Sequence, residues 1–306
     1  MKIIMNADDF GVDIDRDIGI LWGVLTKRIT SVSVIVTNKI GTLRKIMIKV
    51  MKKKADIGIH INLTDNPLIH YSIEELCNNT ICKYEKSKFQ FWENSIKNEL
   101  NLNKIKEEIY IQIDMFKKKY KFNPQHIDGH NHCNIFNAEV EKIFEKISKN
   151  REIFLRIPYE QYNNEELKEI LKQKDYNELI KIQREIKLEN DYVIKNFNKL
   201  CDYDMLLNNI NCIRNCKERL SKVTFIGTLY GYSKDYNYFI KKIEKVGKNA
   251  IVTTMFHPGF YFKFIKHKTK FSNKDRIEEL KNLKKIKKYC KINKIELIKY
   301  GEIGNE

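Results

Sequence analysis

Residues 5–11 read MNADDFG and place two adjacent carboxylates, Asp8 and Asp9, directly after the apolar run of residues 3–5. An ionised carboxylate strongly resists removal from water, so a buried strand seldom ends in two of them without a ligand or a reaction to serve. The apolar run therefore predicts the first strand of the fold, and the acid pair predicts that the end of this strand belongs to a functional site.

The bulk composition fits one large α/β domain or two ordinary ones, with 306 residues, 42% of them hydrophobic and 32% charged. No apolar run approaches the ~20 residues that span a bilayer, and the first residues lack the pattern of a signal peptide. We therefore expect a cytoplasmic protein with no membrane partner. The seven cysteines include no C-x-x-C pair, which favours reduced, structural thiols.

The formal net charge is +17. Such a charge is compatible with nucleic acid, an anionic surface or an acidic substrate. Lysines are spread over the whole chain, however, and acids are interleaved with them in most helical stretches. This pattern favours a compositional bias, so we give the charge little weight and expect no nucleic-acid partner.

Short apolar runs alternate with longer amphipathic ones along the chain. The run at 102–119 has apolar residues at helical spacing and predicts a helix. The alternation predicts a parallel α/β fold, either a closed or nearly closed barrel or a doubly wound open sheet. We expect a single catalytic domain over 1–306, with a polar helical insertion around 163–199. The predicted strands are 2–6, 31–37, 55–62, 125–128, 153–157, 222–226, 250–255 and 295–299.

Polar residues of the kind that bind metals or substrates fall at the ends of five predicted strands. In a parallel barrel the carboxyl ends of the strands share one rim, where active sites are built. We therefore expect these residues to meet at one site. They are the Asp8–Asp9 pair, His60, the segment HIDGHNH at 126–132, Arg156 and His257.

The segment HIDGHNH has its own geometric reading. Residues two apart face the same way along a strand, so His126, Asp128, His130 and His132 would share one side while the strand lasts. Two histidines and a carboxylate with open positions suit a catalytic divalent ion. The alternative is a hydrogen-bonded polar strand end without metal, and the neighbouring acid pair and His60 favour the metal.

The sequence resembles the YdjC-like carbohydrate deacetylases, the family that includes chitooligosaccharide deacetylase. The resemblance covers nearly the whole chain in order, and it implies a distorted (β/α) barrel of about seven parallel strands, related to the polysaccharide deacetylases. The motifs that carry it are NADDFG (6–11), ITSVSVIVTN (29–38), GIHINLT (58–64), HIDGHNH (126–132), RIP (156–158), HPGF (257–260), DRIEELKNL (275–283) and KIELIKYGEI (294–303).

The resemblance also implies roles for individual residues. Asp9, His60 and His130 would bind one divalent ion, with Mg or Zn the first choices. Asp8 would be the general base and His257 the general acid or oxyanion partner, while Arg156 would orient Asp8 or contact the substrate. The substrate would be an N-acetylated sugar or chitooligosaccharide, which loses its acetyl group by hydrolysis. The expected substrate contacts are Asn62, Thr64, Asp128, His132 and Phe260.

Two departures from the family pattern concern specificity. Asn134 stands where a further histidine is usual, and the segment before HPG has no acid. Two other functions remain open at this point: a metal-dependent phosphoesterase that uses the same rim, and a non-catalytic sugar- or nucleic-acid-binding protein. A homodimer is the base-rate expectation for the oligomeric state.

Overall fold

The computed structural model describes residues 1–38, 41–65, 68–82, 84, 86–158, 223–227, 236–261 and 273–303. The insertion predicted around 163–199 lies outside the described residues, so the domain organisation stays a prediction. The described strands form two parallel sheets, one of four strands in the order β7-β8-β1-β9 and one of five in the order β2-β3-β4-β5-β6. Their bounds are β1 Lys2–Ile4, β2 Asn6–Phe10, β3 Ser31–Val34, β4 Asp56–Ile61, β5 His126–Gly129, β6 Phe154–Leu155, β7 Val223–Ile226, β8 Ile251–Thr254 and β9 Glu296–Leu297.

The parallel α/β class predicted from sequence is confirmed, but the barrel of about seven strands is wrong in its detail. The two sheets do not close into one barrel within the described residues. The expected first strand, 2–6, is in fact the start of two strands, because the chain leaves the four-stranded sheet after Ile4 and enters the five-stranded sheet at Asn6. The sheets meet where Asp8 N donates to Phe256 O (2.8 Å) and Phe256 N to Asn6 O (3.0 Å).

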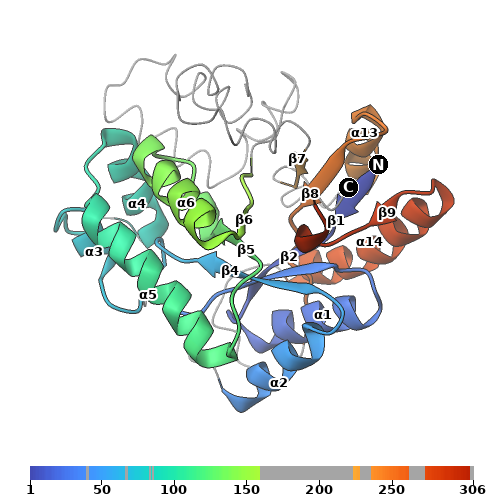
Figure 1. Ribbon diagram of the computed structural model, residues 1–306, viewed down its shortest axis with the longest axis horizontal. Helices are drawn as coiled ribbons and strands as arrows, with labels where there is room; N and C mark the ends of the chain where they lie inside the picture. Colours follow the sequence, from blue (N-terminus) through green and yellow to red (C-terminus); the bar gives the residue numbers. More distant parts are fainter. Residues whose placement is uncertain are drawn as a thin grey trace.

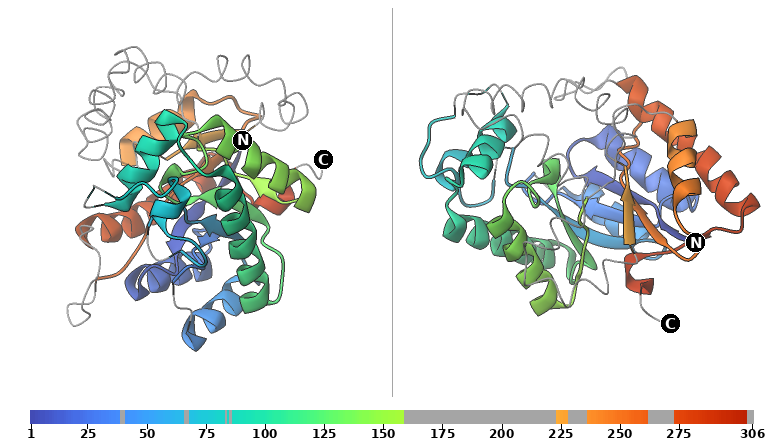
Figure 2. Two further views of the ribbon diagram at one scale, coloured as in Figure 1. Left: turned by 90° about the vertical axis from the view of Figure 1, so that its left-hand side faces the viewer. Right: turned by 90° about the horizontal axis from the view of Figure 1, so that it is seen from above.

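Helices cover the outer sides of both sheets (Figures 1 and 2). Along the five-stranded sheet α1, α2, α5 and α6 follow one another as packed neighbours, while α13 packs against α14 beside the four-stranded sheet. The helices are α1 Ile14–Leu25, α2 Thr42–Met51, α3 Ile73–Leu76, α4 Ser87–Lys97, α5 Leu102–Tyr120, α6 Ala138–Arg151, α13 Tyr236–Lys245 and α14 Asn273–Ile292, with short 3₁₀ turns η1 His130–His132 and η2 Tyr300–Glu302.

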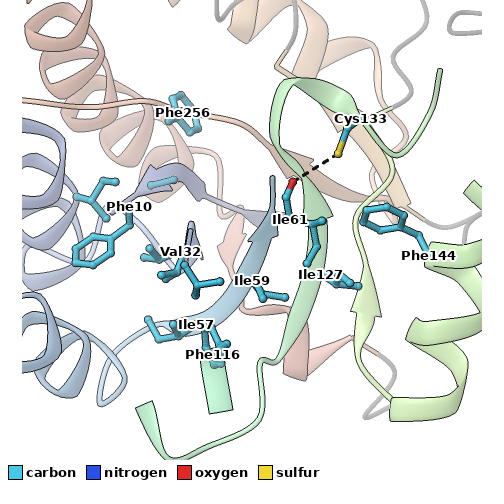
Figure 3. Close-up of a cluster of buried hydrophobic side chains, with 14 of the residues drawn as sticks. Phe10, Val32, Ile57, Ile59, Ile61, Phe116, Ile127, Cys133, Phe144 and Phe256 are labelled. Atoms are coloured by element: carbon cyan, nitrogen blue, oxygen red, sulfur yellow. Dashed lines mark hydrogen bonds between the residues drawn. The ribbon is translucent and has the colours of Figure 1, made fainter. Parts of the chain in front are cut away.

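The outer face of the five-stranded sheet is apolar and forms the core. Every residue of β4 is buried, and Ile57, Ile59 and Ile61 alternate onto one side. They pack in one cluster with Phe116 of α5 and Phe144 of α6 (Figure 3). The predicted helix at 102–119 is thus confirmed as α5, and its apolar stripe covers the sheet.

The inner face of the same sheet is polar although it is equally buried. The alternate residues of β3, β4 and β5 on this face include Ser33, His60, His126 and Asp128, none more than 2% exposed. Gly58 lies among them because a side chain there would sit 2.3 Å from the His126 ring. A buried polar face is stable only when its groups are paired, so this face must form a hydrogen-bond network.

Candidate metal and catalytic site

The acid pair lies on an irregular part of β2. The register between β2 and β3 shifts between Ala7 and Phe10, and Asp9 has a left-handed backbone with φ of 67°. Neighbouring residues of a regular strand face opposite sides, but a bulge re-aims a side chain. Both carboxylates therefore approach the same atom, His60 Nε2, at 3.8 Å from Asp8 Oδ2 and 3.6 Å from Asp9 Oδ1.

Asp9 lies between two histidines and an arginine. Its Oδ1 is 2.9 Å from His130 Nδ1, and its Oδ2 accepts a hydrogen bond from Arg16. Burial alone would raise the pKa of Asp9, but Arg16 and His130 hold this pKa well below its usual range. Asp9 is therefore a carboxylate that stays ionised, with one oxygen facing the histidines and the other held from behind.

The two histidines are each oriented by a second carboxylate. His60 Nδ1 is 2.6 Å from Asp128 Oδ1, and His130 Nε2 is 3.0 Å from Asp65 Oδ2. Metal-binding histidines commonly have a carboxylate on the nitrogen that does not bind the metal. Burial lowers the pKa of His60, but Asp128 and Asp8 outweigh it and raise this pKa to about 10.

Asp9, His60 and His130 fit a divalent ion. Their ligand atoms all lie within 4.8 Å of one another, and one carboxylate oxygen with two imidazole nitrogens suits several divalent cations. A second group, Asp8, His60 and Asp128, is equally compact. Its carboxylates are already bonded to Arg156, so the first group is the better candidate.

Asp8 is held in place by Arg156 and Asn6. Arg156 donates from Nη1 to Asp8 Oδ1 (2.9 Å) and from Nη2 to Asp8 Oδ2 (2.5 Å), and Asn6 donates to Oδ1 (2.6 Å). The same guanidinium lies 2.7 Å from Asp128 Oδ2, which also accepts from Ser33 (2.7 Å). Burial raises the pKa of Asp8 in spite of Arg156 and His60, and the Asp128 carboxylate adds to the rise.

The alternate residues of HIDGHNH were expected to face one side of a strand, and this expectation is wrong beyond Gly129. The strand β5 ends there, and residues 130–132 form η1 with positive φ at Asn131 (50°) and His132 (55°). His126 and Asp128 face the inner side, where His126 contacts Ser33 (2.9 Å) and burial lowers its pKa to about 3. His130 reaches Asp9 only because the chain turns, and His132, two residues further along η1, is partly buried.

His257 follows β8 and is a quarter exposed. Its backbone N–H donates to Glu279 Oε2, and its Nδ1 lies 4.0 Å from Glu279 Oε1. Glu279 comes from α14 and is buried. An acid 22 residues further along the chain thus contacts His257, although the segment just before HPG has none.

The remaining predicted substrate contacts have structural partners. Asn62 Oδ1 accepts from the backbone of Thr64 (3.1 Å) and Asp65 (2.9 Å), and Thr64 Oγ1 accepts from Asn131 (2.9 Å). Phe260 makes an edge contact with Trp22, with 6.1 Å between ring centroids. Their direct contact with a substrate stays a prediction. Sequence reasoning missed Arg16, Asp65 and Glu279, which hold site residues from behind.

The YdjC-like protein family model matches residues 2–287, nearly the whole chain. The chain belongs to the YdjC-like family. Curated relatives named carbohydrate deacetylase are 25% identical over 161 residues in Xenopus laevis and 27% identical over 154 residues in Clostridium beijerinckii. These alignments span 52% and 49% of this chain and 52% and 56% of the relatives, so the chain spans about half the length of the relatives it matches.

A solved structure supports the fold of this YdjC-like chain. The crystal structure of a "putative cellobiose-phosphate cleavage protein" from Enterococcus faecalis superposes with a TM-score of 0.64. The match covers 98% of this chain and 97% of the other at 18% identity, which supports the fold alone. No described helix of this chain is long and apolar enough to cross a membrane.

Proposed function

We propose that this protein is a metal-dependent carbohydrate deacetylase, which hydrolyses the N-acetyl group of an N-acetylated sugar or chitooligosaccharide. The observation that carries the proposal is the convergence of Asp8 and Asp9 on His60 Nε2, with His130 beside Asp9. Family membership and the relatives named carbohydrate deacetylase support the reaction class.

Asp9, His60 and His130 would hold the metal. A divalent ion in that place would supply a water of lowered pKa and would polarise the amide carbonyl. Arg16 keeps Asp9 Oδ2 occupied, so Oδ1 is the oxygen presented beside the histidines. Asp128 and Asp65 fix the two rings from behind.

Asp8 is the proposed general base and His257 the proposed general acid. Asp8 would take the proton of the attacking water, because it faces His60 Nε2 and is held in one orientation by Arg156. His257 would give a proton to the departing amine, because it is partly exposed at the end of β8 and is anchored by Glu279. The products are acetate and the free amino sugar.

The phosphoesterase alternative rests on the basic net charge and on the same metal site. Arg156 is the basic residue expected at the rim that could bind a phosphate. Arg156 is instead buried and paired with Asp8 and Asp128. The role that this arginine fits is the orientation of Asp8.

The first test is acetate release from N,N′-diacetylchitobiose by the full chain, with Mg, Zn, Co or Ni and with a chelator. Release that needs a metal and stops with the chelator is the expected result. An aryl phosphate ester serves as the control substrate and should not be hydrolysed. Hydrolysis of the phosphate ester with no acetate release would replace the proposal with the phosphoesterase.

A further inference from the structure

Helix α2 carries an exposed apolar stripe. Leu43 and Ile46 are each 54% exposed and Val50 is 37% exposed, while Met47, Ile48 and Met51 bury the core side of the same helix. The spacing of three and four residues places the exposed three on one face. In the described part of the chain only four other large hydrophobic residues are exposed, and none of them lies in α2.

The charge of α2 also differs from that of the other described helices. The segment 41–55 contains no acid, whereas each of the other described α-helices contains at least one Asp or Glu. Elsewhere lysines have acidic partners on their own helix, as in Lys97–Glu93 and Lys142–Glu139. The basic residues of the segment are Arg44, which pairs with Asp17 of α1 (2.6 Å), and Lys45, Lys49, Lys52, Lys53 and Lys54.

The lysines lie beside the apolar stripe. Lys45, Lys49 and Lys52 are exposed and share a second face of α2 at helical spacing. The last turn of α5, which packs on α2, adds Lys117, Lys118 and Lys119. Burial and then the charge of Lys45 lower the pKa of Lys119, which shows that the two helices bring their positive charges together. Figure 1 shows α2 and the end of α5 at the lower edge of the molecule.

The combination selects one class of partner. A basic helix with exposed aliphatic residues matches an anionic lipid surface, where the aliphatic groups enter the interface and the lysines reach the headgroups. A second copy of the chain is a poor partner, because a two-fold contact would oppose the same positive charges. A nucleic acid would use the lysines but not the aliphatic stripe.

We propose that α2, with the last turn of α5, docks the protein peripherally on a bilayer that contains anionic lipids. This replaces the expectation from sequence that no membrane is involved. The C-terminal end of α2 leads into the amino end of β4, whereas the candidate site lies at the carboxyl ends of the strands. Lys52, Lys53 and Lys54 therefore lie at the end of the sheet away from that site.

The test is co-sedimentation of the full chain with vesicles of phosphatidylcholine, with and without phosphatidylglycerol. Binding is expected only with phosphatidylglycerol, and it should weaken as salt rises. The triple variant Lys45→Glu, Lys49→Glu, Lys52→Glu should bind at least about 100-fold more weakly, given the attraction of each basic group to an anionic surface. The triple variant Leu43→Ser, Ile46→Ser, Val50→Ser should bind about 10-fold more weakly.

The matched control is Lys281→Glu, Lys284→Glu, Lys285→Glu on α14, which reverses three exposed lysines elsewhere and should leave binding unchanged. Circular dichroism and acetate release in solution check that the α2 variants fold, because no α2 residue is part of the candidate site. Failure of the wild type to bind at low salt overturns the proposal. So does equal binding by the α2 variants, or a dimer of the wild type that dissociates in the serine variant.

Discussion

Asp8 and Asp9 are neighbours in sequence and both are buried, yet the regions around them differ. Asp8 faces Arg156 and Asn6 on the inner side of the five-stranded sheet, where a second carboxylate, Asp128, shares the same guanidinium. Asp9 faces His130 and an arginine of its own, Arg16, at the start of α1. The backbone irregularity between them separates the two environments.

The difference shows how one residue type can serve two tasks at adjacent positions. Burial raises the pKa of Asp8 and the charge of Asp128 adds to the rise, although Arg156 and His60 oppose it. Arg16 and His130 outweigh the burial of Asp9 and lower its pKa. A carboxylate that stays ionised suits a cation ligand, and its differently held neighbour suits proton transfer.

The largest expected effect is loss of the metal from the Asp9 region. Asp9→Asn or His60→Ala removes one of three close ligands, so the protein should no longer retain a divalent ion and acetate release should fall to background. Equilibrium dialysis followed by metal analysis measures the stoichiometry. His70→Ala, which changes an exposed histidine outside the cluster, is the control and should keep the metal. A full complement of metal in His60→Ala contradicts the ligand assignment.

The Asp8 region should respond differently. Asp8→Asn keeps the shape of the side chain but removes the proton acceptor, so turnover should fall about 10³-fold while the metal stays bound. Single-turnover acetate release and metal analysis on the same preparation separate the two effects. Full turnover by this variant would rule out Asp8 as the general base. Loss of the metal would mean that Asp8 is itself a metal ligand.

Sequence reasoning found the residues that meet at the site because each lies in, or just after, an apolar run. Parallel strands bring such positions to one end of the sheet, so the approach of Asp8 and Asp9 to His60 was predictable without a structure. The strand positions were predictable for the same reason. The first strand was wrong in extent because Met5 continues the apolar run of β1 up to the start of β2, and only pairing with β8 and β3 separates the two strands.

Other features depend on contacts that leave no pattern in the sequence. Arg16 looks like an ordinary residue of a helix start, and Glu279 like an ordinary acid of a terminal helix. Their roles arise because α1 and α14 pack beside the strand ends. The position of His130 depends on the turn after Gly129, where Asn131 and His132 have positive φ angles. The alternation of side chains along a strand does not predict such a turn.

A third effect concerns stability on the Asp8 side. Arg156→Met leaves Asp8 and Asp128 buried without their shared cation, so the free energy of unfolding should fall by about 3–5 kcal/mol. Arg156→Lys keeps the charge and should recover part of this stability. A lysine cannot hold both oxygens of Asp8, so acetate release by this variant should stay slower than in the wild type. Denaturant unfolding and acetate release measure the two properties. Equal stability of Arg156→Met and wild type would contradict a stabilising role for the ion pairs of Arg156 with Asp8 and Asp128.

The smallest effects should come from the carboxylates behind the histidines, and their ranking tests how far the two regions differ. Asp128→Asn and Asp65→Asn each weaken the support of one metal-binding ring, which typically costs about 10- to 100-fold in metal affinity. Asp128 is fully buried, whereas the Asp65 side chain is half exposed, so water can replace part of its contact with His130. Competition against a chromogenic chelator should therefore place Asp128→Asn near the upper end and Asp65→Asn near the lower end. The reverse order would mean that Asp65, which holds His130 beside Asp9, contributes more to metal affinity than Asp128 does.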